Sequence, residues 1–318
     1  MGNARRTPEE VKPLLRGVVN VQVTPFKSMT EIDREALRDN TRFMIENGIV
    51  KGRGVLAIGG STGEGFSLSE IEYEQLIDVV IEEANGRVPV CVGCVRPATQ
   101  PVVELAKYAE RAGADCIMVL APHYYPNEPQ DVVYAHFKAV ADATGIPMMI
   151  YNNPPATGQD LSVGLLRRLA EIDQIIALKE CTLRTDKLRE VAFYLADRFA
   201  LLPCTTPRTM PFDYQLGAVG FVTWFANFSP AYALEIHDVC LAHDHARAQE
   251  IYARSRPLGT YIEAAVRAGG LDREIAFVKE MCRLAGRPMG EIERLPIVRP
   301  SRDERHELRR LMTEAGLL

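Results

Sequence analysis

A lysine interrupts an apolar run of the chain, Ile175–Cys181, which reads Ile-Ile-Ala-Leu-Lys-Glu-Cys. Lysine is rarely buried without a partner or a task. Burial disfavours its charged form and leaves a neutral amine that can attack a carbonyl carbon. Lys179 is therefore a candidate for Schiff-base chemistry. The alternative is a salt bridge with Glu180 or another carboxylate, although adjacent residues of a strand point to opposite faces.

Three other groups of residues that could take part in catalysis or binding also lie at the ends of apolar runs. The segment Gly60–Glu64 places Ser61 and Thr62 between glycines, and its N–H and O–H donors could cradle a carboxylate. A glycine-rich turn with a helix cap explains this segment equally well. Tyr151 could transfer protons, or it could be a core residue whose hydroxyl is satisfied. Tyr124 lies in an aromatic loop bounded by prolines, where packing is the simplest explanation.

The elements that would position these groups alternate along the chain. Short runs rich in Val, Ile and Leu, without strict alternation, are typical of strands buried on both faces. The runs are Val18–Pro25, Gly54–Gly60, Pro89–Cys94, Cys116–Pro122, Pro147–Asn153, Ile175–Cys181, Phe199–Cys204 and Gly220–Asn227. Segments with helical spacing lie between them: Asp33–Asn47, Ser69–Glu83, Gln100–Ala112, Pro129–Ala143, Val163–Glu171, Thr185–Ala196, Pro207–Leu216 and Pro230–Ala242.

This alternation predicts an α/β fold, a (β/α)₈ TIM barrel over residues 17–242, with the active site at the carboxyl ends of the strands. A doubly wound sheet is the alternative. It is disfavoured because Thr-Pro-Phe, rather than a glycine-rich phosphate loop, follows the first strand. About three further helices are expected in a C-terminal extension over 243–318: Ala246–Ala268, Asp272–Leu284 and Arg302–Ala315. Residues 1–16 would form an N-terminal arm, either swapped or frayed.

Composition narrows the class of protein. The 318 residues are 47% apolar and 25% charged, as in ordinary globular proteins. The net charge of −5 gives no indication of a basic surface that would bind nucleic acid. The apolar runs fall short of the ~20 residues that span a bilayer, and residues 1–16 lack the apolar core of a signal peptide. We therefore expect a cytoplasmic protein with neither nucleic-acid nor membrane partners.

The seven cysteines are an odd number and lie in apolar segments. Cys116, Cys181 and Cys204 are predicted to be reduced, buried thiols. Cys91 and Cys94 have metal-like spacing, but on a strand they would face opposite sides. No partner motif follows them, so we expect core cysteines and no metal site.

Taken together, the motifs resemble those of the dihydrodipicolinate synthase/N-acetylneuraminate lyase family. Gly60–Glu64, Tyr151–Pro154 with Thr157–Gly158, and Leu178–Glu180 occur in the family's order, each at the end of a predicted strand. The resemblance extends from Gly17 to the C-terminus. It implies a class I aldolase-type barrel without metal or organic cofactor, assembled as a homotetramer that is a dimer of dimers.

The resemblance also implies roles for individual residues. Lys179 matches the Schiff-base lysine, and Tyr151 matches the tyrosine that shuttles protons. Ser61 and Thr62 match the hydroxyls that hold the carboxylate of the 2-oxo acid and relay protons. Tyr124 matches a relay tyrosine that tetrameric members receive from the neighbouring subunit.

Substrate contacts are expected around these groups. Gly60 would let the backbone approach the substrate, and Val222 on the eighth strand is a further predicted contact. Trp224 and Phe225 stand where many relatives carry small or β-branched residues. Either aromatic residue could shape an apolar pocket, and core packing explains them at least as well.

One departure bears on the substrate. Where dihydrodipicolinate synthases carry an arginine that grips the carboxylate of the aldehyde, this chain has Ala156. Because the bidentate guanidinium is lost, aspartate semialdehyde looks doubtful as a substrate. We therefore expect a Schiff-base 2-oxo acid lyase or aldolase that uses pyruvate outside lysine biosynthesis, acting on an apolar or uncharged partner.

Two alternatives remain open. The same lysine could serve a dehydratase or deaminase of a hydroxylated 2-oxo acid, such as a 3-deoxy sugar acid. The chain could also be a non-catalytic barrel. The presence of both Lys179 and Tyr151 disfavours a non-catalytic barrel.

Overall fold

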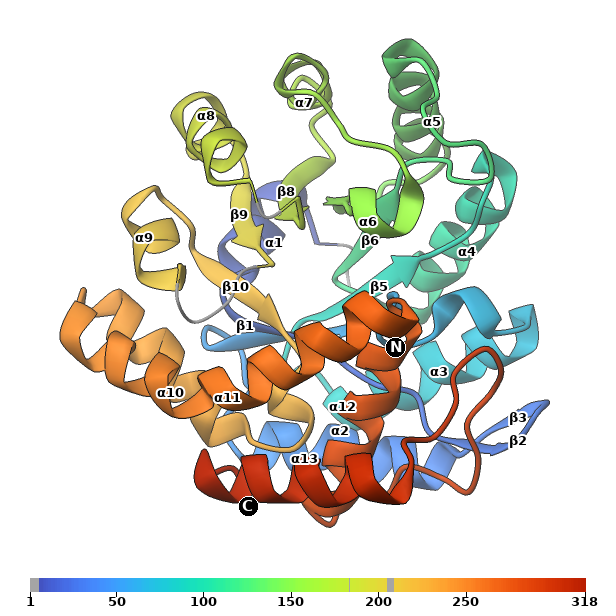
Figure 1. Ribbon diagram of the computed structural model, residues 1–318. Helices are drawn as coiled ribbons and strands as arrows, with labels where there is room; N and C mark the ends of the chain where they lie inside the picture. Colours follow the sequence, from blue (N-terminus) through green and yellow to red (C-terminus); the bar gives the residue numbers. More distant parts are fainter. Residues whose placement is uncertain (1–5, 183, 205–208) are drawn as a thin grey trace.

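Parallel strands arranged in a ring form the centre of the molecule (Figure 1). The computed structural model describes residues 6–182, 184–204 and 209–318. The strand order is β10-β1-β4-β5-β6-β7-β8-β9, and the Val219 N–H donates to the Leu201 carbonyl (3.1 Å) where β9 approaches β10. The predicted (β/α)₈ barrel is confirmed. The strands are Gly17–Val21 (β1), Gly54–Ile58 (β4), Val90–Cys94 (β5), Cys116–Leu120 (β6), Met148–Asn152 (β7), Ile175–Glu180 (β8), Ala200–Pro203 (β9) and Gly220–Thr223 (β10).

Every residue of these strands is buried, which explains why the sequence shows runs rather than alternation. One face contacts the barrel interior and the other contacts the helices. The predicted runs extend past several strand ends into the loops. The largest difference is Gly220–Asn227, in which β10 is followed by the 3₁₀ helix Phe225–Asn227 (η3).

Helices surround the ring and pair with the strands as expected. They are Arg34–Glu46 (α2), Glu70–Ala84 (α3), Thr99–Ala112 (α4), Gln130–Ala143 (α5), Val163–Leu169 (α7), Thr185–Leu195 (α8), Met210–Gln215 (α9) and Pro230–Leu241 (α10). The predicted capping box at the start of α3 is present, because Ser69 and Glu72 each bond the other's backbone N–H. The predicted start of α9, at Pro207, lies outside the described residues.

Short elements that the sequence patterns did not predict lie in the loops. A hairpin, Phe26–Ser28 (β2) with Glu31–Ile32 (β3), follows β1. A 3₁₀ turn, Gly65–Ser67 (η2), follows β4, and a single helical turn, Pro154–Thr157 (α6), follows β7. The last two extend the loops at the carboxyl ends of the strands.

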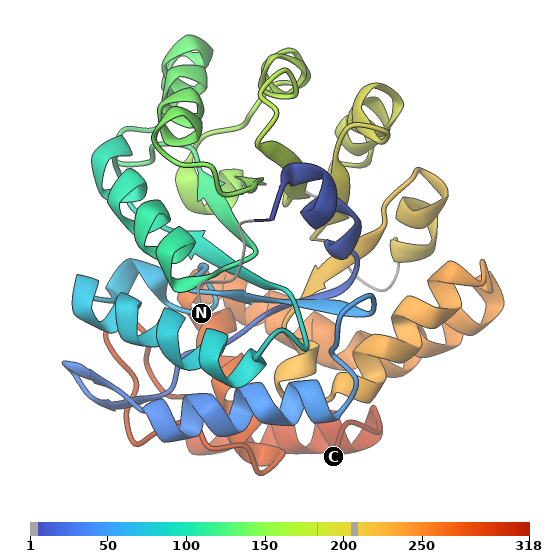
Figure 2. The same cartoon turned by 180° about the vertical axis from the view of Figure 1, so that it is seen from behind.

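The start of the chain closes the other end of the barrel (Figure 2). Pro8–Val11 (α1) and the 3₁₀ helix Lys12–Leu14 (η1) lead directly into β1. Val11 and Leu15 are fully buried in the cluster of side chains that fills the barrel interior. Residues 6–16 are thus docked on their own chain.

Three helices, His245–Gly269 (α11), Asp272–Leu284 (α12) and Arg302–Glu314 (α13), pack along one side of the barrel (Figure 1). They contact one another, and α11 also contacts α10. In the described ranges no helix has both the length and the apolar character that crossing a bilayer requires.

Candidate active site

Lys179 and Tyr151 lie side by side on neighbouring strands. The register of β7 and β8 pairs the two residues, and the Lys179 Nζ is 3.8 Å from the centroid of the Tyr151 ring. Lys179 is 3% exposed and Tyr151 4%. Lys179 forms no ion pair with any described residue, so the alternative of a salt bridge with Glu180 is not observed. Its amine is left facing the barrel interior.

Glu180 points away from the barrel interior and belongs to a separate network. Asn152 donates to its carboxylate (2.9 Å), and Lys187 on α8 lies 3.4 Å from it. Lys187 also pairs with Asp160, which accepts a second bond from Asn152. This network ties the ends of β7 and β8 to the helix that follows, so it fixes the strand ends that carry Tyr151 and Lys179.

Two groups contact the Tyr151 hydroxyl. The Ser61 and Tyr151 hydroxyl oxygens are 3.3 Å apart, and Asn153 Nδ2 donates to Tyr151 Oη (2.8 Å). Thr62 follows in the same loop and is half-buried. The structure therefore brings together Lys179, Tyr151 and the hydroxyl loop. Asn153 was present in the sequence motif, but its contact with Tyr151 was not foreseen.

The loop that carries Ser61 has two residues with positive φ angles. Gly59 has a φ of +63°, and a Cβ there would lie 2.6 Å from the ring of the buried Tyr73. Glu64 also adopts the left-handed region, with a φ of 56°. Its carboxylate accepts a bond from Lys279 on α12 (2.7 Å), and both side chains are fully buried. A C-terminal helix therefore anchors the loop.

The sequence patterns did not lead us to predict a role for Lys279. The signal was present, because this lysine follows the apolar residues 275–278, as Lys179 follows 175–178. Lys279 also pairs with Glu293 (2.8 Å). A lysine in an apolar segment indicates a partner or a task, and here the observed partners are two buried carboxylates.

The predicted substrate contacts of β4 and β10 occupy the barrel mouth. Val222 is buried, at 7% exposure, in the cluster that fills the barrel interior. A Cβ on Gly60 would lie 3.2 Å from the Met118 side chain, so the space there is tight. Trp224 packs on Phe225, with ring centroids 4.3 Å apart, and its Nε1 donates to Glu274 Oε1 of α12 (2.9 Å). Glu274 had no signal in the local sequence.

Tyr124 and Ala156 stand apart from this cluster. Tyr124 is 74% exposed and contacts Tyr125 edge to face. Among the described residues it makes no contact with Tyr151. Ala156 is exposed on α6. The structure therefore does not bring either residue to Lys179 within a single chain.

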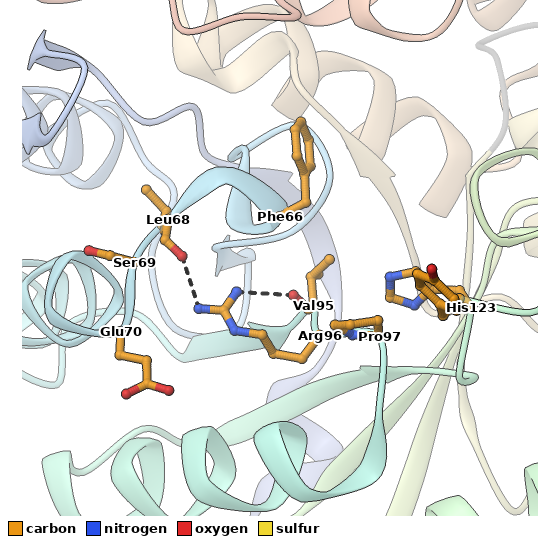
Figure 3. A pocket seen from close by; sticks show the side chains of 9 residues that line it. Phe66, Leu68, Ser69, Glu70, Val95, Arg96, Pro97 and His123 are labelled. Carbon is orange, nitrogen blue, oxygen red and sulfur yellow. Dashed lines mark hydrogen bonds between the residues drawn. The ribbon is translucent and has the colours of Figure 1, made fainter.

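A hollow of about 550 Å³ lies beside the mouth, between the loops that follow β4, β5 and β6. Figure 3 shows Arg96 in its wall, with the guanidinium directed toward Leu68 and away from His123. Arg96 donates to the carbonyls of Gly65 (2.8 Å) and Leu68 (3.1 Å). Because neither Lys179 nor Tyr151 lines this hollow, it is distinct from the candidate site.

One prediction about the cysteines is wrong. Cys181 and Cys204, expected to be reduced, form a disulfide with a Cα–Cα distance of 4.9 Å. They follow the neighbouring strands β8 and β9, where the Cys204 N–H donates to the Glu180 carbonyl (2.8 Å). Cys116 is a free, buried thiol, as are Cys91 and Cys94. Within the described ranges no cluster of His, Cys, Asp or Glu is suited to holding a metal ion.

Comparison with known proteins gives a consistent result. The model of the dihydrodipicolinate synthetase family matches residues 14–315. A 4-hydroxy-tetrahydrodipicolinate synthase of Methylobacterium radiotolerans is 34% identical over 96% of this chain and 97% of its own length. A protein of the same name from Methanocaldococcus jannaschii is 32% identical over 96% of this chain and 100% of its own length.

Solved structures are similar over the same length. Dihydrodipicolinate synthase from Aquifex aeolicus superposes with a TM-score of 0.83 at 31% identity, covering 95% of this chain and 99% of that one. The enzyme from Acinetobacter baumannii, solved in complex with pyruvate, gives 0.83 at 28% identity over 96% and 100%.

These names overturn one expectation. From Ala156 we expected a reaction outside lysine biosynthesis, whereas the curated relatives are named for 4-hydroxy-tetrahydrodipicolinate synthesis. The prediction was wrong because it inferred the aldehyde substrate from Ala156 alone. The structure gives a physical reason: Ala156 is exposed on α6, away from Lys179, whereas Trp224 after β10 and Glu274 of α12 lie at the mouth.

Proposed function

Because this chain belongs to the dihydrodipicolinate synthetase family, we propose that it condenses pyruvate with aspartate semialdehyde through an imine on Lys179. This is the reaction that yields the product named in its relatives, 4-hydroxy-tetrahydrodipicolinate. The observation that carries the proposal is the placement of the buried Lys179 amine 3.8 Å from the Tyr151 ring, with the Tyr151 hydroxyl beside Ser61.

The geometry suits the first half of this reaction. The amine of Lys179 attacks C2 of pyruvate, water leaves, and an iminium forms. The Ser61 and Thr62 hydroxyls would hold the pyruvate carboxylate, with the backbone at Gly60 close by. Holding the carboxylate orients C3 toward Tyr151, which converts an encounter into a positioned reaction.

The second half uses the same groups. The iminium withdraws electrons, so C3 loses a proton to Tyr151 and becomes an enamine. The enamine carbon attacks the aldehyde carbon, and the aldehyde oxygen takes up a proton. The amino group of the aldehyde substrate then attacks C2 and displaces the Lys179 amine, which closes the ring and releases the product. Asn153, which donates to Tyr151 Oη, would hold this hydroxyl in place for both transfers. Val222 and Trp224 would line the space for the aldehyde.

Borohydride trapping tests the proposal. Reduction of the protein with pyruvate should leave a stable pyruvyl adduct on Lys179, located by peptide mapping. Adding aspartate semialdehyde without borohydride should consume pyruvate and release the condensation product. The matched control, Lys179→Ala, should form no adduct and lose turnover while its circular dichroism is unchanged. Turnover above a few per cent in this variant would exclude the imine mechanism.

The assembly is proposed separately. We infer a homotetramer in which Tyr124 reaches the active site of a neighbouring subunit. The support is its exposure of 74% beside Tyr125 at 68%, which leaves two aromatic rings uncovered in one chain. Light scattering coupled to gel filtration gives the mass in solution, and a monomer would contradict the inference. The cytoplasmic location also stays a prediction, which fractionation of the source cells would check.

A further inference from the structure

A carboxyl group from outside the barrel reaches its mouth. Glu274 lies in the first turn of α12, and its Oε1 accepts the bond from Trp224 Nε1 (2.9 Å). Trp224 follows β10 and packs against the cluster that contains Tyr151 and Val222. The charge of Lys179 also acts on the Glu274 carboxyl. The hydrogen bond from Trp224 therefore places the Glu274 carboxyl at the mouth of the barrel, near enough to Lys179 for its charge to act on it.

This carboxyl lacks a cation in direct contact. Among the described residues the Glu274 side chain accepts one hydrogen bond, from Trp224, and forms no ion pair. Burial raises its pKa, while the Trp224 hydrogen bond and the charge of Lys179 oppose that change. Glu274 is half-buried, and a carboxylate that has lost part of its water is best stabilised when it is both paired and hydrogen-bonded. A ligand that brings a positive charge would supply what the site lacks.

The other carboxyls near the end of β8 do not share this property. Glu180 and Asp160 both lie beside Lys187, and both accept bonds from Asn152. Their charges are compensated within the protein. Glu274 is thus distinguished from them by its position at the mouth and by its missing cation.

We propose that Glu274 binds the amino group of the aldehyde substrate and selects aldehydes that carry one. This rests on the proposed function, because aspartate semialdehyde carries an ammonium group beside its carboxylate. Ala156 offers no guanidinium to grip that carboxylate, so the ammonium group is the other charged handle. The indole N–H holds Oε1 and leaves Oε2 for the ligand.

A pair of substrates tests the assignment. Succinic semialdehyde has the aldehyde and the carboxylate of aspartate semialdehyde but no amino group. We would measure kcat/KM for both at saturating pyruvate, with product identified by mass spectrometry. The proteins would be the parent, Glu274→Gln, Glu274→Asp, and Asp272→Asn as a matched control in the same helical turn. A hydrogen bond between charged groups predicts that Glu274→Gln lowers the preference for the amino substrate roughly 10- to 100-fold.

Every outcome decides the inference. It is supported if Glu274→Gln loses the preference, Glu274→Asp keeps part of it, and Asp272→Asn keeps it whole, with pyruvate trapping on Lys179 intact in all. Equal losses for both semialdehydes would mean a structural or proton-transfer role and overturn it. An unchanged preference would overturn it alone, leaving the proposed function standing. A parent protein that traps pyruvate yet condenses neither semialdehyde would overturn both.

Discussion

At the scale of single residues, the candidate catalytic lysine differs from the other lysine near the end of β8 in its ion pairs. Lys179 is buried against an aromatic ring and has no carboxylate partner among the described residues. Lys187 on α8, in contrast, forms ion pairs with Asp160 and Glu180. The difference follows from strand geometry, because Lys179 and Glu180 point to opposite faces of β8. The ion pairs of Lys187 stabilise the fold, whereas the amine of Lys179 is free to contact a substrate.

Tyr151→Phe tests the proton-transfer role at this scale. Removing the hydroxyl should lower kcat by roughly 10²- to 10⁴-fold, the usual contribution of general acid/base catalysis. The KM for pyruvate should change far less, because Lys179 and the Ser61 loop remain. Steady-state kinetics measures both quantities.

The control is Tyr214→Phe, which deletes another buried hydroxyl, one that lies 2.6 Å from His237 Nδ1 and away from the site. Its kcat should match that of the parent. An unchanged kcat in Tyr151→Phe would remove Tyr151 from proton transfer.

At the scale of elements, buried polar side chains join helices to strands. His136 on α5 is an example: its Nε2–H donates to the Leu120 carbonyl of β6 (3.1 Å), so its Nδ1 accepts from the Thr99 hydroxyl of α4 (2.9 Å). Burial lowers the pKa of His136 to about 4. The neutral ring thus ties three consecutive elements together, and protonation would cost its bond with Thr99.

This gives a prediction for stability against pH. The unfolded chain binds the proton of His136 near the ordinary pKa of 6.5, but the folded protein binds it only near 4. Stability from this group is therefore complete above pH 6.5 and is lost as the pH falls toward 4, by about 3 kcal/mol in all. Urea unfolding between pH 7 and pH 5 measures the slope.

His136→Gln should flatten that slope. It will not remove it entirely, because burial also lowers the pKa of His237. The variant His306→Gln, on the exposed side of α13, serves as the control and should keep the parent's slope. Identical slopes in the parent and His136→Gln would contradict the assignment.

At the scale of the whole molecule, α12 connects the C-terminal helices to the candidate site. It carries Lys279, which anchors the loop of Ser61 through Glu64, and Glu274, which reaches Trp224. The two residues are a little over one turn apart, so a single helix supports two sides of the barrel mouth. The C-terminal helices are therefore part of the candidate site as well as a cover on the barrel.

Lys279→Met should destabilise the protein strongly. It leaves Glu64 and Glu293, which are 0% and 4% exposed, without their shared cation. Breaking a buried pair in this way costs about 3–5 kcal/mol. Urea denaturation followed by circular dichroism gives the change in the free energy of unfolding.

Arg310→Met is the control, since Arg310 pairs with Glu307 and Glu314 at the exposed surface of α13. Exposed pairs contribute about 1 kcal/mol or less. If Lys279→Met were no more destabilising than Arg310→Met, the anchoring role of Lys279 would be refuted.

The order of elements and the strand-end motifs could be predicted from the sequence, because both are local properties. Buried parallel strands require continuous apolar runs, and Lys179 stands out against such a run. The partners of these groups could not be predicted in this way. Asn153 precedes α6 and donates back to Tyr151, and the disulfide joins residues that follow the neighbouring strands β8 and β9.

The sequence by itself therefore determined the barrel, its family and the lysine and tyrosine of the candidate site, since each leaves a periodic or local pattern. Tertiary structure alone decided that Glu274 and Lys279 of α12 reach the loops of β10 and β4. These contacts join residues 50 and 215 positions apart. No local pattern encodes them, because they arise from how one helix packs across the side of a closed ring.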